Sequence, residues 1–550
     1  MSSRRVIVLG LDALNFSLVK DGLGGGLLPH LQEAMALGVS GTLRSTLPPY
    51  SAPAWVTFAT GKLPDKHEVF DFWRVSYTPR RQLTPMSSHS INGATTWQIA
   101  SRHGKRVGVV QVPMTYPPRP ANGFVVADMI VTPNEQVDYT SPLSLKAEIR
   151  EHFGEFALNP YRAFGQSEAA LRRATDAERT QEQVSRYLLE RYPCDLFISV
   201  CRATDIVQHH FRSFLVPADG TAPQAQQHER FDAPLRELFA VLDDAIAHRL
   251  TLLDGNTVLL IVSDHGFGPA AKVFNVNRFL ADLGLAEFHD SRVQSCGRRL
   301  VRSAIRVAKA LDVLKLRRQL SRETIRSAVR ATDEAASLPR DWAHTKAWSG
   351  TPSAEGIYVN LKGRESIGIV EPGAEYEEVR QRILDGLRAL RDPDTGEPII
   401  EAAYRREEVY TNPPAHCPDI LIDFGMRPYK VRETLSANAW LEPMPLRSGA
   451  GRHTPEGVFV AVGADVPKGV TVQGLNLVDV APTLLYALGL PVPQDMDGRV
   501  LTEIFTEQHV AAEPPSYDAA DGAQSSDAGF AYTPAEEAEI TKQLRDLGYV

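Results

Sequence analysis

Residues 259–268 read LLIVSDHGFG, four aliphatic residues followed by a serine, an adjacent carboxylate and imidazole, and glycines. An apolar run that stops abruptly at polar residues is typical of a buried parallel strand. Ligands of open α/β sheets bind outside the carboxyl ends of such strands, where Asp264 and His265 stand. The pair could serve one metal ion or two, or form only the polar turn after a strand. Further candidate metal ligands elsewhere in the chain decide between these interpretations.

The beginning of the chain repeats this pattern. Residues 6–11 (VIVLGL) form a second apolar run, which ends at Asp12. Residues 27–37 have the pattern of a helix that stops at Gly38, and residues 39–43 are expected to form the next strand. Asp12 is therefore a second candidate ligand at the carboxyl end of a strand.

A third buried strand is expected at residues 195–200, and Asp205 and His209 follow it closely. At a spacing of four on a helix, the two side chains share one face, as two ligands of one metal ion must. An isolated pair at this spacing is more often a solvated contact. Its position after a buried strand favours the metal-binding interpretation.

The segments between the strands have helical patterns, notably residues 95–102, 141–192 and 231–250, and a further strand is expected at 107–112. Strands and helices thus alternate, with the notable polar residues at or just beyond the strand ends. This arrangement predicts an α/β fold with a doubly wound, mostly parallel sheet flanked by helices and a site along one edge.

Ser51 lies in a proline-rich loop that leads into a short predicted helix, with Pro53 suited to its first turn. The simpler interpretation is that the Ser51 hydroxyl only caps the helix. The functional alternative is a nucleophile, assisted by a helix N-terminus that favours an anionic substrate.

The composition is that of an ordinary globular protein. The chain has 550 residues, enough for one large core with additions or for two to three domains. A hydrophobic content of 43% and a charged content of 23% are unexceptional, and the net charge of -8 argues against general affinity for nucleic acid.

The four cysteines indicate a reducing compartment. Cys194, Cys201, Cys296 and Cys417 show no CxxC spacing, so we expect free thiols. The run at residues 6–11 is too short for a signal peptide, and no run approaches the eighteen or so apolar residues of a transmembrane helix. The expected location is the cytoplasm.

Residues 292–330 differ in charge from the rest of the chain. They carry twelve Lys or Arg residues against two acidic ones, with apolar residues at helical spacing. This pattern predicts a basic amphipathic insert. It could lie on an anionic membrane, on a nucleic acid or polyphosphate, or over the acidic body of its own protein, and we expect the last.

Six segments are expected along the chain. They are a first part of the core with the nucleophile and most ligands (1–290), the basic helical insert (291–345), a small α+β cap that includes the edge of the main sheet (346–424), a second part of the core (425–505), a disordered linker (506–532) and a C-terminal helix that docks back (533–550). His453 lies in a glycine-flanked loop of the second core part, before a strand at 458–463.

The combined inventory of Asp12, Asp205, Asp264, His209, His265 and His453, with the Ser51 hydroxyl, suits two divalent cations. A mixture of carboxylates and imidazoles favours Zn²⁺, with Mn²⁺ as the alternative, over Ca²⁺ or Mg²⁺. Two such ions about 4 Å apart could activate a hydroxyl and hold a leaving oxygen in a displacement at phosphorus.

The order of these residues resembles the alkaline phosphatase superfamily, and within it the type I phosphodiesterase and nucleotide pyrophosphatase group, in its bacterial and archaeal phosphohydrolase or phosphomutase-like form. The resemblance runs through Asp12, Ser51, the segment TGKLPDKH at 60–67, Asp205 with His209, SDHG at 263–266 and a late His453. It implies an alkaline-phosphatase-like core and a small phosphoester or nucleotide substrate.

The resemblance also implies roles for individual residues. Asp205, His209 and His453 would hold one ion, while Asp12, Asp264 and His265 would hold the other, with the Ser51 hydroxyl beside it. Ser51 would attack phosphorus and form a phospho-enzyme intermediate. His67 matches the motif but is expected to be structural, and His209 is preferred to its neighbour His210 as the ligand because of its spacing from Asp205.

One position departs from the family pattern. Phe72 stands five residues after His67, where similar nucleotide pyrophosphatases carry an asparagine that contacts a phosphate oxygen. We therefore do not carry over nucleotide specificity. Lys272, Asn275 or Asn277 could supply a replacement donor in substrate binding.

Three functions remain open at this stage. A two-metal hydrolase of phosphodiesters or pyrophosphates agrees best with the residues. A metal-dependent phosphomutase would use the same core, and an inactive binding protein would keep the fold after losing a ligand or the nucleophile, none of which is missing here.

Overall fold

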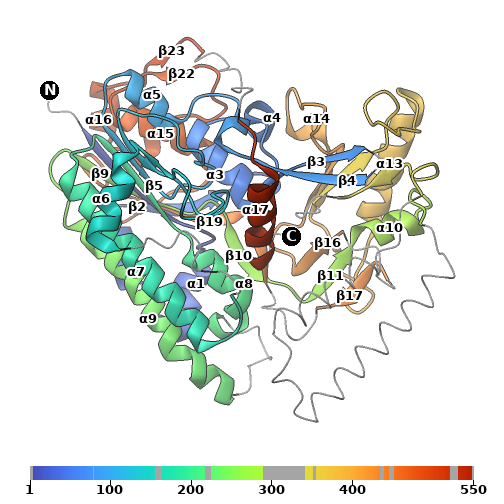
Figure 1. The fold of residues 1–550 in the computed structure, drawn as a ribbon, viewed down its shortest axis with the longest axis horizontal. Coiled ribbons are helices and arrows are strands. Elements are labelled where there is room, and N and C mark those ends of the chain that lie inside the picture. The colour runs from blue at the N-terminus through green and yellow to red at the C-terminus, as the bar shows by residue number, and fades with distance from the viewer. Residues whose placement is uncertain are drawn as a thin grey trace.

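A computed structural model describes residues 4–78, 80–154, 161, 164–216, 225–288, 341–350, 355–433, 439–444, 451–520 and 530–547. The basic insert predicted at 292–330 lies outside these residues. The described chain forms a core built on one large sheet and a smaller cap beside it (Figure 1). None of its helices has both the length and the apolar character needed to cross a membrane.

The large sheet confirms the predicted fold class. Five adjacent strands run parallel, and β19 is inserted antiparallel between β9 and β2. In the described part of the chain the sheet has ten strands, in the order β20 (Val470–Thr471), β2 (Val39–Arg44), β19 (Glu456–Gly463), β9 (Thr257–Val262), β1 (Arg5–Leu11), β8 (Leu196–Cys201), β5 (Val107–Val110), β6 (Gly123–Val126) and β7 (Thr140–Ser141), with β21 (Leu475–Asn476) also paired to β2.

Helices cover both faces of this sheet because successive strand residues point to opposite sides. Ile7 and Leu9 of β1 belong to one apolar cluster, and Val6 and Val8 belong to another. The first cluster includes residues of α1 (Phe16–Asp21), α2 (Pro29–Leu37), α6 (Ser144–Phe153), α7 (Glu168–Arg191), α8 (Ala203–Leu215) and α9 (Ala225–Leu250). The second includes residues of α3 (Ser51–Thr60), α5 (Thr96–Arg102) and α15 (Val480–Ala487).

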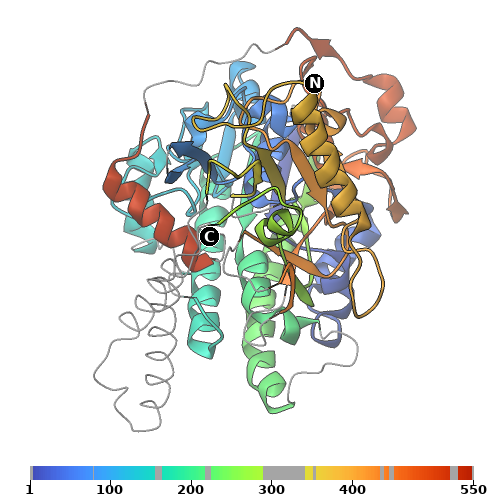
Figure 2. The same ribbon diagram turned by 90° about the vertical axis from the view of Figure 1, so that its right-hand side faces the viewer.

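The described residues of the cap form two small sheets and three helices. One sheet has the order β12 (Ala347–Trp348), β13 (Gly356–Val359), β15 (Ile420–Asp423), β14 (Ala402–Arg405), and the other has the order β16 (Tyr429–Arg432), β11 (Lys272–Asn275), β17 (Leu441–Pro443). The helices are α10 (Val276–Asp282), α13 (Ala374–Ala389) and α14 (Arg406–Val409). Figure 2 looks onto the cap with α13 in front.

The expectation that this subdomain includes the edge of the main sheet is wrong. β13 and β15 pair with each other and bury their side chains in an apolar cluster of the cap itself. That cluster also contains Phe274 and Val431, so the cap takes in residues on both sides of the predicted range 346–424. Local strand patterns do not indicate which partner a strand will choose, which is why the sequence misplaced this boundary.

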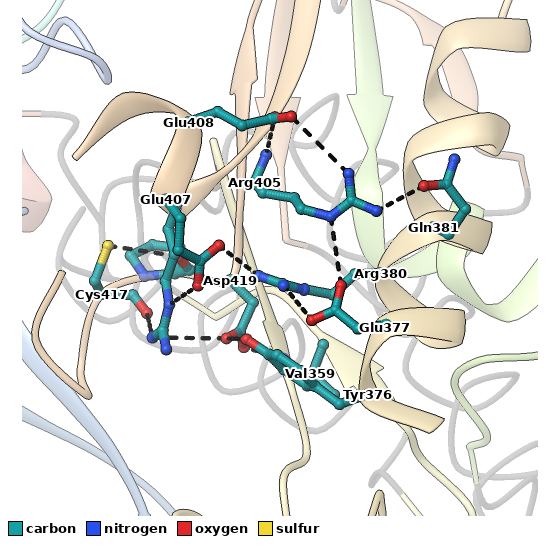
Figure 3. Close-up of polar contacts among 12 residues, drawn as sticks. Val359, Tyr376, Glu377, Arg380, Gln381, Arg405, Glu407, Glu408, Cys417 and Asp419 are labelled. Atoms are coloured by element: carbon teal, nitrogen blue, oxygen red, sulfur yellow. Dashed lines mark hydrogen bonds and ion pairs between the residues drawn. The ribbon is translucent and has the colours of Figure 1, made fainter. Parts of the chain in front are cut away.

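Polar contacts also fasten the cap elements together (Figure 3). Arg380 of α13 donates a hydrogen bond of 2.6 Å to Glu407 of α14, and Arg405 of β14 donates one of 2.6 Å to Gln381 of α13. The buried Asp419 accepts a hydrogen bond of 2.5 Å from the Tyr376 hydroxyl. The cap is therefore a packed unit in which most cationic side chains have a partner.

The C-terminal region differs in part from the disordered linker predicted at 506–532. Its described residues include α16 (Glu507–Ala512), and β23 (Tyr517–Asp518) pairs with β22 (Val492–Pro493). The helix is capped by Thr506, and His509 is buried against Tyr486 and Phe505, contacts that composition does not reveal. The last helix of the described chain is α17 (Pro534–Leu547), which buries Ile540 and Leu544 against the core and lies beside the strand β4 (Arg80–Pro85).

Candidate metal centre

The topology of the large sheet brings the predicted site residues to one edge. β1, β8 and β9 are parallel neighbours, so Asp12, α8 and the pair Asp264 and His265 all follow strands that end on the same side. β19 runs the other way, and the chain therefore passes this edge just before β19 begins, at His453. The elements that carry these residues meet near the middle of the molecule (Figure 1).

Asp205, His209 and His453 form the first cluster of potential metal ligands. The Nε2 atoms of the two histidines lie 3.0 Å apart, and they lie 3.3 Å and 3.1 Å from Asp205 Oδ1. A tetrahedral ion with bonds of about 2.0–2.2 Å separates its ligand atoms by about 3.3–3.6 Å. The three atoms are therefore spaced almost as a shared ion requires.

His453 reaches this cluster from a short strand, so its predicted position in a loop is wrong. β18 (Gly451–Thr454) pairs antiparallel with β10 (Gly266–Pro269), which places His453 opposite Phe267. A Cβ atom at Gly451 would lie 2.0 Å from Cε1 of Phe267, so only glycine allows this approach. The His453 ring stacks on His265 with 4.0 Å between ring centroids, which joins the two clusters.

Asp12, Asp264 and His265 form the second cluster, and all three are fully buried. His265 Nε2 lies 3.2 Å from Asp264 Oδ2 and 3.7 Å from Asp12 Oδ1. The Nδ1 atom of His265 lies 3.1 Å from the carbonyl oxygen of Gly266, a contact that places its proton on Nδ1 and leaves Nε2 as a lone pair. Asp264 Oδ1 accepts a hydrogen bond from the Ala13 amide, which orients Oδ2 toward the cluster.

Ser51 is the first residue of α3 and lies beside the second cluster. Its Oγ atom is 3.0 Å from His265 Nε2 and 3.5 Å from Asp12 Oδ1. Tyr50, in an extended conformation, is the N-cap residue, so Ser51 is inside the helix and is not its cap. The capping interpretation of Ser51 is thus replaced by a hydroxyl directed at the candidate ligands.

The site concentrates negative charge in the interior. Asp12, Asp205 and Asp264 are fully buried, and Arg202 is a buried cation beside them, with Nη1 3.4 Å from Asp12 Oδ2. Burial raises the pKa of Asp12, while burial and the charge of Asp12 raise the pKa of Asp264 well above its usual range. Buried carboxylates gathered in this way require cations for compensation.

The donor set fits divalent metal ions. Burial lowers the pKa of His265 and of His453, so both rings are neutral near pH 7, the form that binds metals. Within the described chain, the buried Oδ2 atom of Asp264 has no hydrogen-bond donor. Two imidazoles with one carboxylate, and one imidazole with two carboxylates, are donor sets typical of zinc or manganese.

Several residues that sequence reasoning missed position the second cluster. Arg202 pairs with Asp12, and the Trp55 indole donates a hydrogen bond of 3.3 Å to the same carboxylate. The Gln208 amide donates one of 2.8 Å to the carbonyl oxygen of Ala13. Arg202 directly follows β8. A cationic residue at the end of a buried strand is the sequence feature that could have identified it.

The structure supports two of the finer distinctions made from the sequence. His67 is buried and contacts the Thr57 hydroxyl at 2.9 Å, while burial lowers its pKa to about 3, so its role is structural. His209 faces Asp205 and His453, whereas the ring of the adjacent His210 packs against Phe164.

The three side chains proposed to replace the phosphate-binding asparagine form bonds with other residues of the cap. Lys272 forms ion pairs with Asp392 and Asp394, both at 2.5 Å. The side-chain amide of Asn275 donates to the carbonyl oxygen of Ala439, and that of Asn277 donates to the carbonyl oxygens of Ser349 and Glu433. These bonds stabilise the cap and leave the substrate-binding role of the three residues a prediction without structural support.

The chain belongs to the type I phosphodiesterase / nucleotide pyrophosphatase family, whose sequence profile matches residues 6–437. This family is part of the alkaline phosphatase superfamily. The matched range includes all the predicted site residues except His453, which follows it.

Solved structures of low sequence identity resemble the chain over most of its length. Human ectonucleotide pyrophosphatase / phosphodiesterase 5 is 12% identical with a TM-score of 0.46, and the match covers 91% of this chain and 98% of that one. The murine protein is 12% identical with a TM-score of 0.47 and coverages of 92% and 100%. An inactive form of the murine protein in complex with AMP is 13% identical with a TM-score of 0.46 and coverages of 88% and 95%. No curated protein sequence matches the chain.

Proposed function

We propose that the protein is a metal-dependent phosphoester hydrolase that cleaves phosphodiesters or pyrophosphates of small molecules, with Ser51 as nucleophile. The observation that carries this proposal is the placement of the Ser51 hydroxyl 3.0 Å from His265 Nε2, beside two clusters with the donor spacing of metal sites. Family membership supports the same class of reaction.

Asp205, His209 and His453 would hold one divalent cation, and Asp12, Asp264 and His265 would hold the other. Zn²⁺ suits these donors best, with Mn²⁺ as the alternative. Bound there, the cations would favour ionisation of the Ser51 hydroxyl and neutralise charge that develops on the phosphoryl oxygens.

The chain's own groups define the remaining steps. The Ser51 hydroxyl loses its proton to solvent, and Oγ forms a bond to phosphorus while the bond from phosphorus to the leaving oxygen breaks. The leaving oxygen takes up a proton from solvent, and a phosphoserine ester results. Because Ser51 is the first residue of α3, the amide groups at the N-terminus of this helix would favour the negative charge of the same phosphoryl group. Water then cleaves the ester and restores the serine hydroxyl.

We also propose that the protein acts in the cytoplasm. Cys194, Cys201 and Cys417 are buried free thiols, as expected in a reducing compartment, while Cys296 lies outside the described residues.

The decisive experiment combines metal analysis with a phosphoester screen. Purified protein loaded with Zn²⁺ or Mn²⁺ should cleave bis-p-nitrophenyl phosphate, and Ser51→Ala should abolish this activity while it keeps the bound metal. The screen also includes a monophosphorylated sugar or glycerate. Conversion of that substrate into an isomer, in place of release of free phosphate, would indicate a phosphomutase. Absence of any turnover by the metal-loaded wild type would favour the inactive binding protein and refute the hydrolase.

A further inference from the structure

Two cationic side chains lie on β16, a cap strand that packs against the strand that carries His453. Lys430 and Arg432 alternate along β16 with Tyr429 and Val431. Tyr429 and Val431 are buried in the apolar cluster of the cap, whereas Lys430 and Arg432 are half-buried on the opposite face of the strand. Because successive residues of a strand point to opposite sides, the two cations share one face.

That face is directed toward the core. β16 lies against β18, the strand that carries His453. The charge of Lys430 is also felt on α8. Burial lowers the pKa of His210 to about 4, with further contributions from the charges of His209 and Lys430. Burial and Arg432 lower the pKa of Lys430 to about 8, against the opposing effect of Asp205.

The pairing of these cations differs from that of others in the cap. Arg364, Arg380 and Arg427 form ion pairs with cap carboxylates, and the exposed Lys362 pairs with Glu371. Lys430 and Arg432 form no ion pair and no side-chain hydrogen bond with any residue that the structure describes. Half-buried cations without a carboxylate partner are costly unless a bound anion compensates them.

We propose that Lys430 and Arg432 bind a second phosphate of the substrate, next to the phosphoryl group that is attacked, and thereby select phosphoanhydrides such as nucleoside diphosphates over simple diesters. The inference rests on the proposed function. It assigns to the cap strand β16 the phosphate contact that similar nucleotide pyrophosphatases make through an asparagine and that is missing here because Phe72 occupies that position. The donors considered from the sequence, Lys272, Asn275 and Asn277, are already bonded within the cap.

The chemistry of the two side chains suits this role. A guanidinium can bind two phosphate oxygens at once, and an ammonium supplies a compact charge beside it. A substrate such as bis-p-nitrophenyl phosphate has no second phosphate and cannot use either contact. We therefore expect Lys430 and Arg432 to affect the preference for phosphoanhydrides more strongly than the rate of bis-p-nitrophenyl phosphate hydrolysis.

The test compares two inhibitors of bis-p-nitrophenyl phosphate hydrolysis that differ by one phosphoryl group, α,β-methylene-ADP and AMP. In the wild type, α,β-methylene-ADP should inhibit more strongly than AMP. In Lys430→Gln and Arg432→Gln, that preference should fall about tenfold or more, the loss expected for one charge-assisted hydrogen bond. Lys430→Arg and Arg432→Lys should restore most of it.

The control is Lys362→Gln, which removes an exposed cation of the same cap and should keep the wild-type preference. Metal content is measured for every variant. The inference would be overturned if α,β-methylene-ADP and AMP inhibited the wild type equally well. It would also be overturned if Lys430→Gln and Arg432→Gln weakened inhibition by both compounds to the same extent and lost bound metal.

A calorimetric titration of metal-loaded Ser51→Ala with α,β-methylene-ADP separates this inference from the proposed function. Binding that weakens when Lys430→Gln is added supports the cation pair, whatever the turnover of the wild type. If the wild type cleaves bis-p-nitrophenyl phosphate but this titration is unaffected by Lys430→Gln, the phosphate assignment fails and the hydrolase stands.

Discussion

The Nε2 atoms of His209 and His453 lie 3.0 Å apart although 244 positions separate the two residues in the chain. Each ring also approaches the same oxygen of Asp205. Two imidazole nitrogens directed at one point beside a buried carboxylate are the arrangement that a divalent cation requires. The first cluster is therefore the most direct place to test the metal centre.

We predict that His453→Gln reduces the bound metal from two equivalents toward one and lowers kcat/KM at least 100-fold, because removal of one of three protein ligands opens the first site. Elemental analysis after gel filtration measures the metal, and bis-p-nitrophenyl phosphate measures activity. His210→Gln is the matched control, since its ring packs against Phe164, and it should keep both metals. Full metal content in His453→Gln would exclude His453 as a ligand.

We predict that acid quenching during turnover of a phosphodiester traps phosphate on Ser51, because Ser51 Oγ lies within reach of the second cluster. Peptide mass spectrometry should locate the phosphoserine at position 51. Ser51→Thr should keep measurable activity, since a hydroxyl remains, whereas Ser51→Ala should lose it by a factor of about 1,000 or more. Label at another residue, or full activity in Ser51→Ala, would contradict the mechanism.

Arg202→Met should destabilise the metal-free protein by about 3–5 kcal/mol, because it leaves the buried Asp12 carboxylate without its cation. Urea denaturation with and without Zn²⁺ measures the change, which should shrink when the metal is bound. Arg106→Met is the control, since the side chain of Arg106 is exposed where it pairs with Asp195, and it should cost less than about 1 kcal/mol. Equal effects of the two substitutions would refute the role assigned to Arg202.

The buried Glu178 predicts a pH dependence of stability. Burial raises its pKa from 4.5 to about 7 in the folded protein. The folded state therefore binds the proton more tightly, so Glu178 favours folding below pH 4.5 and this contribution is lost as the pH rises through 7.

Glu178→Gln removes this titration while Gln can still accept the hydrogen bond from Tyr161. The stability of the variant relative to the wild type should therefore rise by about 3 kcal/mol between pH 4 and pH 8. Urea unfolding across this range measures the difference. A constant difference between the two proteins would show that the Glu178 pKa is the same in both states.

Local patterns in the sequence are sufficient for the large sheet and for five of the seven residues placed around its edge. Apolar runs that end in Asp12, Asp264 or the approach to Asp205 identify buried parallel strands, and parallel neighbours must end on the same side. The spacing of Asp205 and His209 already places both on one helical face. Family resemblance added the role of Ser51, whose local pattern also fits a helix cap, and the assignment of His453, which no local pattern supports.

Contacts between distant segments decided the remaining features, because a strand pattern does not specify its partner. The pairing of β18 with β10 turns a glycine-flanked segment into the strand that carries His453, and the cap sheet forms apart from the main sheet. Arg202 and Lys430 look like ordinary charges in the sequence. Arg202 has its role because it is buried beside Asp12, and Lys430 has its role because of the face of β16 on which it lies. The energy of a charge depends on what surrounds it, and the sequence does not give those surroundings.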